Sequence, residues 1–184
     1  MSSAESAILQ VRPDSTQILY EVLIPEGVAA VRWHLIYDRD HNGRLSEDEY
    51  NSMAQGIART IRDNLKLKLE GNDIPVEVVD AKIQAAYAND GLSGKISALV
   101  ILQAREIPPG LRKLEIEMTP LVDAGKPAIF RLEPVEASIE SIAGAIQLRF
   151  EDGTLGVKLQ AGTHCVILID VPVPKRSPDE RPAR

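Results

Sequence analysis

The chain has 184 residues, of which 44% are hydrophobic and only 4% aromatic, so we expect one domain with a mostly aliphatic core. Its net charge of −6 and the lack of a basic tract argue against nucleic acid as a partner. No apolar run reaches the roughly 18 residues that a membrane span needs.

The first predicted elements are the two strands of a β-hairpin. Residues 7–12 and 17–24 are apolar and β-prone, and the turn-like residues 13–15 separate them. A Pro-Glu-Gly break at 25–27 then ends the second strand.

Residues 28–37 fit two patterns. Their apolar side chains match either a helical face (Val28, Val31, Leu35, Ile36) or the alternation of a strand (Val31, Trp33, Leu35, Tyr37). We predict a helix, because Pro25 suits a helix N-terminus and because a calcium loop of the kind described next is flanked by helices.

Residues 38–49 carry oxygen-bearing side chains at the spacing that a calcium ion requires. Counting Asp38 as position 1, the oxygens and the turn residue fall at positions 1, 3, 5, 6, 9 and 12 (Asp38, Asp40, Asn42, Gly43, Ser46, Glu49). Calcium takes six to eight oxygens at about 2.3–2.6 Å, and a carboxylate at position 12 can give two of them. Gly43 can adopt the positive φ that the turn needs. The alternative is an Asp/Asn-rich surface turn that binds nothing.

The loop is followed by the clearest helix of the sequence. Ser46 and Glu49 form a capping-box pattern. A helix is predicted over residues 46–64, and its apolar stripe continues to the residue that follows it (Tyr50, Met53, Ala54, Ile57, Ala58, Ile61, Leu65).

From residue 65 onward the apolar period changes from 3.6 to 2. Strands are predicted at 65–69, 74–79, 81–87, 95–104, 111–118, 128–132, 145–150, 156–160 and 164–171. Turn signals separate many of these strands, at 70–73, 89–91, 108–110, 123–125 and 152–153. We therefore predict an α+β fold, an antiparallel β-sandwich-like domain over residues 1–171, followed by a proline-rich flexible tail at 172–184.

Other catalytic or metal-binding patterns are weak. His164 and Cys165 are adjacent, but neighbours on a strand point to opposite faces, so we expect no nucleophile–base pair. His34 and His41 lack metal-ligand spacing to a further His or Cys. We predict no enzymatic activity.

The pattern Asp38-x-Asp40-x-Asn42-Gly43-x-Leu45-Ser46-x-x-Glu49 resembles an EF-hand, over a helix–loop–helix region of about 26–64. The resemblance implies Ca²⁺ as cofactor, with Asp38, Asp40, Asn42, Arg44 (through its carbonyl), Ser46 and Glu49 as ligands. EF-hands usually pair. The best second candidate, residues 89–100, lacks an acidic residue at positions 3 and 12, so we expect a single hand. Leu45 must then pack on the β domain, a second protomer or a partner.

The order of hairpin, loop, helix and Leu-x-Leu-x-Leu-Glu-Gly is also similar to bacterial extracytoplasmic β-sandwich domains that carry one EF-hand. This resemblance implies a location outside the cytoplasm, in a periplasmic or secreted protein or in the soluble part of a membrane-anchored one.

Three functions follow as hypotheses. The first is a calcium-stabilised structural or protein-interaction module, with a protein partner or a homodimer. The second is a calcium-responsive switch that moves the segment of Trp33, Tyr37 and Tyr50 and alters a partner surface. The third is a carbohydrate-binding or hydrolytic sandwich that carries a structural calcium.

Overall fold

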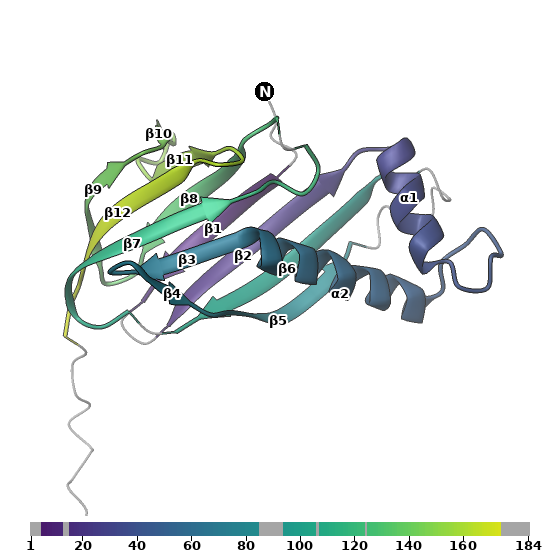
Figure 1. Cartoon of the computed structure of the whole chain (residues 1–184), viewed down its shortest axis with the longest axis horizontal. Coiled ribbons are helices and arrows are strands. Elements are labelled where there is room, and N and C mark those ends of the chain that lie inside the picture. Colours follow the sequence, from purple (N-terminus) through teal and green to yellow (C-terminus); the bar gives the residue numbers. More distant parts are fainter. Residues whose placement is uncertain (1–4, 13–14, 85–93, 106, 124, 174–184) are drawn as a thin grey trace, which may run out of the picture.

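The computed structural model describes residues 5–12, 15–84, 94–105, 107–123 and 125–173. Within these ranges the chain is a β-rich α+β fold with two sheets and two helices (Figure 1). The predicted tail at 172–184 and the turn signal at 89–91 lie largely or wholly outside the described residues. Neither described helix is both long and apolar enough to cross a bilayer.

The larger sheet has seven strands in the described residues. In spatial order they are β10 (Ile146–Arg149), β11 (Leu155–Leu159), β8 (Ala128–Pro134), β1 (Glu5–Val11), β2 (Thr16–Ile24), β6 (Ile96–Ala104) and β5 (Val76–Ile83). All neighbours are antiparallel except β1 and β8, which run parallel. The prediction of a purely antiparallel sheet is therefore wrong at this pair.

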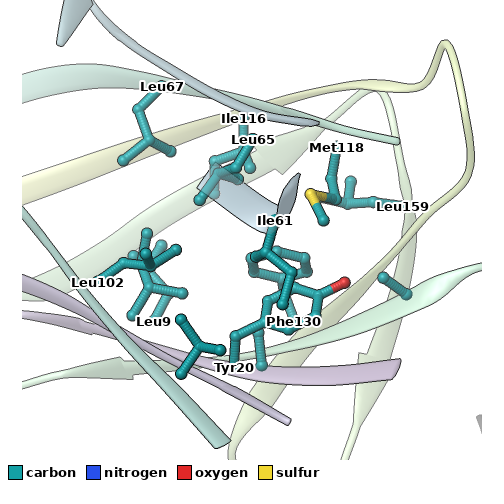
Figure 2. Close-up of a cluster of buried hydrophobic side chains, with 14 of the residues drawn as sticks. Leu9, Tyr20, Ile61, Leu65, Leu67, Leu102, Ile116, Met118, Phe130 and Leu159 are labelled. Atoms are coloured by element: carbon teal, nitrogen blue, oxygen red, sulfur yellow. The ribbon is translucent and has the colours of Figure 1, made fainter. Parts of the chain in front are cut away.

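The smaller sheet has five described strands, all paired antiparallel. In spatial order they are β4 (Asn72–Ile74), β3 (Leu65–Leu69), β7 (Gly110–Met118), β12 (His164–Val171) and β9 (Ser138–Ala143). The buried side chains of the two sheets and of the helices form one core cluster, whose centre is drawn in Figure 2. Alternate residues of β2 and β12 are buried, as the period-2 pattern predicted.

Three strands differ from the prediction. β5 runs through Val76–Ile83 and joins most of two predicted strands, while residues 85–87 of the second lie outside the described part. β4 begins inside the stretch predicted as a turn. β9 was not predicted at all.

Helix α2 (Glu47–Asn64) anchors the helix–loop–helix segment to the β core. It contacts β5, β6 and β3, and its last residue runs directly into β3 (Figure 1). Met53, Ile57 and Ile61 are fully buried, as the apolar stripe predicted, and each such side chain contributes about 1.5–3 kcal/mol. This burial fixes the direction from which the first turn of α2 approaches the loop.

Helix α1 (Val28–Tyr37) has the predicted bounds, but its packing face is different. Three apolar residues of the predicted face are exposed: Val28 by 79%, Leu35 by 53% and Ile36 by 68%. Ala30 and His34 are buried instead. The side chain of Tyr37 lies over Gly56 of α2, so close approach at small residues decides which face packs.

The contact between Tyr37 and Gly56 gives a first prediction. A Cβ at Gly56 would lie 2.6 Å from Cζ of Tyr37 and closer still to its hydroxyl oxygen. Gly56→Ala should lower the free energy of unfolding by up to about 2 kcal/mol, because overpacking costs about 1–3 kcal/mol and is offset by a gain of about 1 kcal/mol in helix propensity.

Thermal melting of single and double variants measures this balance. In a Tyr37→Ala background the clash is absent, so Gly56→Ala should raise the melting temperature. The packing described here is wrong if Gly56→Ala has the same effect in both backgrounds.

Candidate metal centre

The loop between α1 and α2 lies at one end of the molecule, away from the sheet edges formed by β9 and β10 (Figure 1). Asp38 caps the C-terminus of α1, where its N–H donates to the carbonyl of His34 at 2.8 Å. Asp38 is buried, as is Glu49 in the first turn of α2, while Asp40 is exposed. The loop therefore carries two buried carboxylates and an exposed one.

These three carboxylates converge. One oxygen from each of Asp38, Asp40 and Glu49 lies within 4.8 Å of the others. Two oxygens bound to one calcium ion at about 2.3–2.6 Å are at most about 5 Å apart. The donor set is all oxygen and anionic, which suits a hard divalent cation, so these residues fit the predicted ion. No other such group of three His, Cys, Asp or Glu side chains is found in the described ranges.

Backbone N–H groups hold the loop in its curled form. Asp38 accepts from the N–H groups of Asn42 (3.1 Å) and Gly43 (3.0 Å), one on each carboxylate oxygen. Asp40 accepts from the N–H and the side-chain amide of Asn42, at 3.2 and 2.7 Å. Gly43 has φ of 77°, the positive value expected at this position. Each oxygen of Asp38 accepts one of these bonds, which leaves capacity for a cation.

Glu49 is fixed by donors from both ends of the loop. Its Oε1 accepts from the Arg39 N–H at 2.7 Å, and its Oε2 accepts from the N–H and the hydroxyl of Ser46, each at 2.8 Å. The Ser46 Oγ accepts from the Glu49 N–H in return, at 3.4 Å, so the predicted capping box is confirmed. The Ser46 N–H, the Ser46 hydroxyl and the Arg39 N–H lower the pKa of the Glu49 carboxyl from its usual 4.5.

The remaining predicted ligands lie in the same loop. The N–H of Asn42 donates to both Asp38 and Asp40, and its Oδ1 accepts from the N–H of Arg44 at 2.8 Å. Leu45 is partly buried and packs against the core cluster of its own chain. The loop is thus anchored on the chain's own core.

Sequence reasoning missed Arg39. Its N–H donates to Glu49, and its guanidinium Nη2 donates to Ser52 Oγ at 3.1 Å. Any residue except proline would supply the N–H at this position, so that contact leaves no sequence signal. An arginine 13 residues before a serine is equally uninformative without the fold.

The His164–Cys165 pair behaves as its strand position predicted. His164 is exposed, with Nε2 3.0 Å from Glu115 Oε2, whereas Cys165 is buried. Burial raises the pKa of the Cys165 thiol to about 11. These two side chains therefore do not form a nucleophile–base pair.

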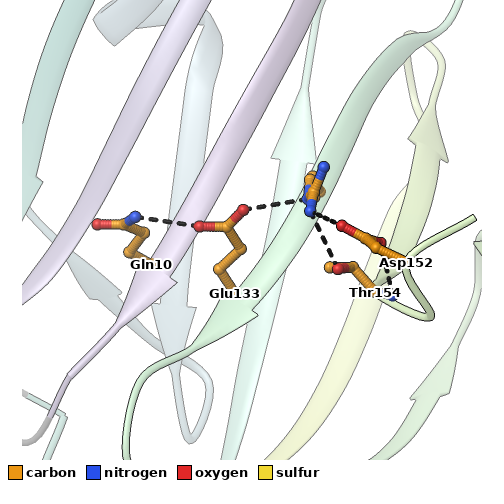
Figure 3. Close-up of polar contacts among 5 residues, drawn as sticks. Gln10, Glu133, Asp152 and Thr154 are labelled. Atoms are coloured by element: carbon orange, nitrogen blue, oxygen red, sulfur yellow. Dashed lines mark hydrogen bonds and ion pairs between the residues drawn. The ribbon is translucent and has the colours of Figure 1, made fainter. Parts of the chain in front are cut away.

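A second polar cluster crosses β1, β8 and the β10–β11 turn (Figure 3). Gln10 donates to Glu133, and Arg131 pairs with both Glu133 and Asp152 and also donates to Thr154. An open hollow of about 500 Å³ adjoins it. Hydrogen bonds from Thr154 and the charge of Arg131 lower the pKa of Asp152, which is the opposite of what a general acid needs. This polar cluster is best explained as a set of hydrogen bonds and ion pairs that link neighbouring strands.

Comparisons of the sequence with protein-family models and with curated proteins find no match. One solved structure that matches is an aminopeptidase N family protein from Idiomarina loihiensis, with a TM-score of 0.35 and 7% identity. The match covers 89% of this chain and 29% of that chain, so this chain spans less than a third of that protein's length. A likeness this distant carries no argument about function.

The capping box gives a second prediction. In ion-free buffer with EDTA, Ser46→Ala should lower the free energy of unfolding by about 1 kcal/mol, because α2 loses its N-cap and Glu49 loses a donor. Asn51→Ala, at an exposed site of the same helix, is the control and should not destabilise. Equal unfolding free energies for Ser46→Ala and the wild type, from denaturant titrations, would contradict the capping geometry.

Proposed function

We propose that this chain is a non-enzymatic calcium-binding module, with a single EF-hand that holds one Ca²⁺ in the loop of residues 38–49. The observation that carries the proposal is the convergence of Asp38, Asp40 and Glu49 within 4.8 Å, at positions 1, 3 and 12 of the loop. Asn42 and Ser46 would add side-chain oxygens and Arg44 its carbonyl, which gives the all-oxygen donor set that calcium prefers.

In this proposal the ion supplies positive charge between carboxylates that otherwise repel one another. The protein residues do the positioning. Asp38 is the C-cap of α1 and Glu49 lies in the first turn of α2, so a ligand bound by both joins the two helices. Binding would therefore stabilise the segment against the β core.

Two contacts favour a stabilising role over an opening one. Tyr37 lies over Gly56, and Leu45 packs on the core, so the two helices pack closely against each other and the loop is held on the β core. A sensor hand instead opens its helices and exposes an apolar groove. A stabilising site needs calcium at a constant high concentration, so we also propose a location outside the cytoplasm.

A second candidate, a calcium-responsive switch, is favoured by the exposed side of α1. Val28, Leu35 and Ile36 are exposed there. Trp33 stacks on Tyr37 with ring centroids 6.0 Å apart, directly before Asp38. A change at Asp38 would reach this surface through the last turn of α1.

Thermal melting with and without calcium tests the proposal. Calcium at about 100 times its Kd should add about 2.7 kcal/mol of stability, or roughly 5–10 °C for a domain of this size. Glu49→Gln should abolish the gain. Glu47→Gln removes the same charge from the same helical turn, at an exposed residue outside the cluster. This control variant should keep the gain in stability from calcium.

Calcium affinity then separates the two candidates. A Kd of about 10⁻⁴–10⁻³ M supports the stabilising module, and one of about 10⁻⁷–10⁻⁵ M supports the switch. If millimolar calcium leaves the wild-type melting temperature unchanged, the loop is an acidic turn and the proposal is wrong.

A further inference from the structure

Arg39 connects the beginning of the loop to α2 by two separate contacts. Its main-chain N–H donates to Glu49 Oε1 at 2.7 Å, and its guanidinium Nη2 donates to Ser52 Oγ at 3.1 Å. The Ser52 hydroxyl in turn donates to the carbonyl of Asp48 at 2.8 Å. One residue between Asp38 and Asp40 is therefore tied to the first two turns of the helix that carries Glu49.

The Ser52 hydroxyl acts both as an acceptor and as a donor in this chain of contacts. It accepts from Arg39 while it donates its single proton to Asp48. The guanidinium makes the first bond charge-assisted, and such bonds are stronger than neutral ones. The geometry thus requires a hydroxyl at residue 52.

The charge of Arg39 opposes cation binding by itself. A guanidinium beside a calcium loop repels the incoming ion. Any gain in calcium affinity from Arg39 must therefore come from the contacts that its side chain makes rather than from its charge. Arg44 offers the matched comparison, because it lies in the same loop with the same charge. In the described part of the structure, its guanidinium has no hydrogen bond or ion pair, and only its N–H is engaged, with Asn42.

We propose that Arg39 is a positioning residue, whose guanidinium on Ser52 braces the loop in its ion-ready form and raises calcium affinity. The proposal rests on the calcium site proposed above. The brace keeps Asp38 and Asp40, on either side of Arg39, at the separation from Glu49 that one cation needs. A site held in its bound geometry loses less conformational entropy on binding and therefore binds more tightly.

Isothermal titration with calcium, on the full chain, tests the brace. Ser52→Ala changes no charge and should weaken calcium binding roughly two- to tenfold, which corresponds to the loss of the hydrogen bond between Arg39 and Ser52. Ser52→Thr keeps the hydroxyl and should restore wild-type affinity. Alanine is a better helix former than serine, so Ser52→Ala should not lower the melting temperature of the ion-free protein, and lost affinity is then not lost folding.

The two arginines complete the test. Arg44→Ala should strengthen binding by removing a repulsive charge, whereas Arg39→Ala should bind more weakly than Arg44→Ala. In a Ser52→Ala background the two arginine variants should bind alike. The brace is overturned if Ser52→Ala binds as the wild type does and Arg39→Ala matches Arg44→Ala. If the wild type itself binds no calcium, the proposed function fails and the brace fails with it.

Discussion

The repulsion among three carboxylates in one short loop is the constraint on which the structure of the helix–loop–helix segment depends. Asp38, Asp40 and Glu49 place like charges within 4.8 Å, and such charges repel unless donors or a cation compensate them. In the chain alone, N–H groups of Arg39, Asn42, Gly43 and Ser46 supply part of that compensation. The Ser46 N–H, the Ser46 hydroxyl and the Arg39 N–H favour the charged form of Glu49 and lower its pKa. The same bonds tie Glu49 to both ends of the loop.

The β core makes this loop geometry reproducible. Buried Met53, Ile57 and Ile61 fix α2 on β5 and β6, and Glu49 lies in the first turn of the same helix. On the other side, Tyr37 over Gly56 fixes α1, whose C-cap residue is Asp38. Packing thus determines where two of the three carboxylates lie, and hydrogen bonds within the loop determine the rest. A site built this way is coupled to folding, because whatever joins Asp38 to Glu49 also joins the helices to the core.

Much of the loop geometry was predictable from sequence because its determinants are local. The spacing of Asp38, Asp40 and Glu49, the glycine at 43 and the capping box all act within twelve residues. Long-range features were not. The parallel pairing of β1 with β8 joins residues more than 120 positions apart, and the brace from Arg39 to Ser52 depends on how α2 leaves the loop.

Bulges account for the errors at β5 and β9. In β5 the pairing shifts between Val78 and Asp80, which interrupts the alternation and divided one strand into two in the prediction. In β9 the partners of Ile139 and Ile142 are Ile169 and Ile167, so an extra residue gives a spacing of three that does not resemble a strand. For α1, periodicity located the apolar residues but not the packed face, because small residues and Tyr37 decide that contact.

A nuclear magnetic resonance titration of backbone amides with calcium is the most direct test of the proposal that the loop of residues 38–49 binds one calcium ion. We expect the amides of residues 38–49 to shift along one saturable curve with a single ion per chain, while those of β1 and β2 stay unchanged. Shifts spread over the sheets, or none in the loop, would contradict it.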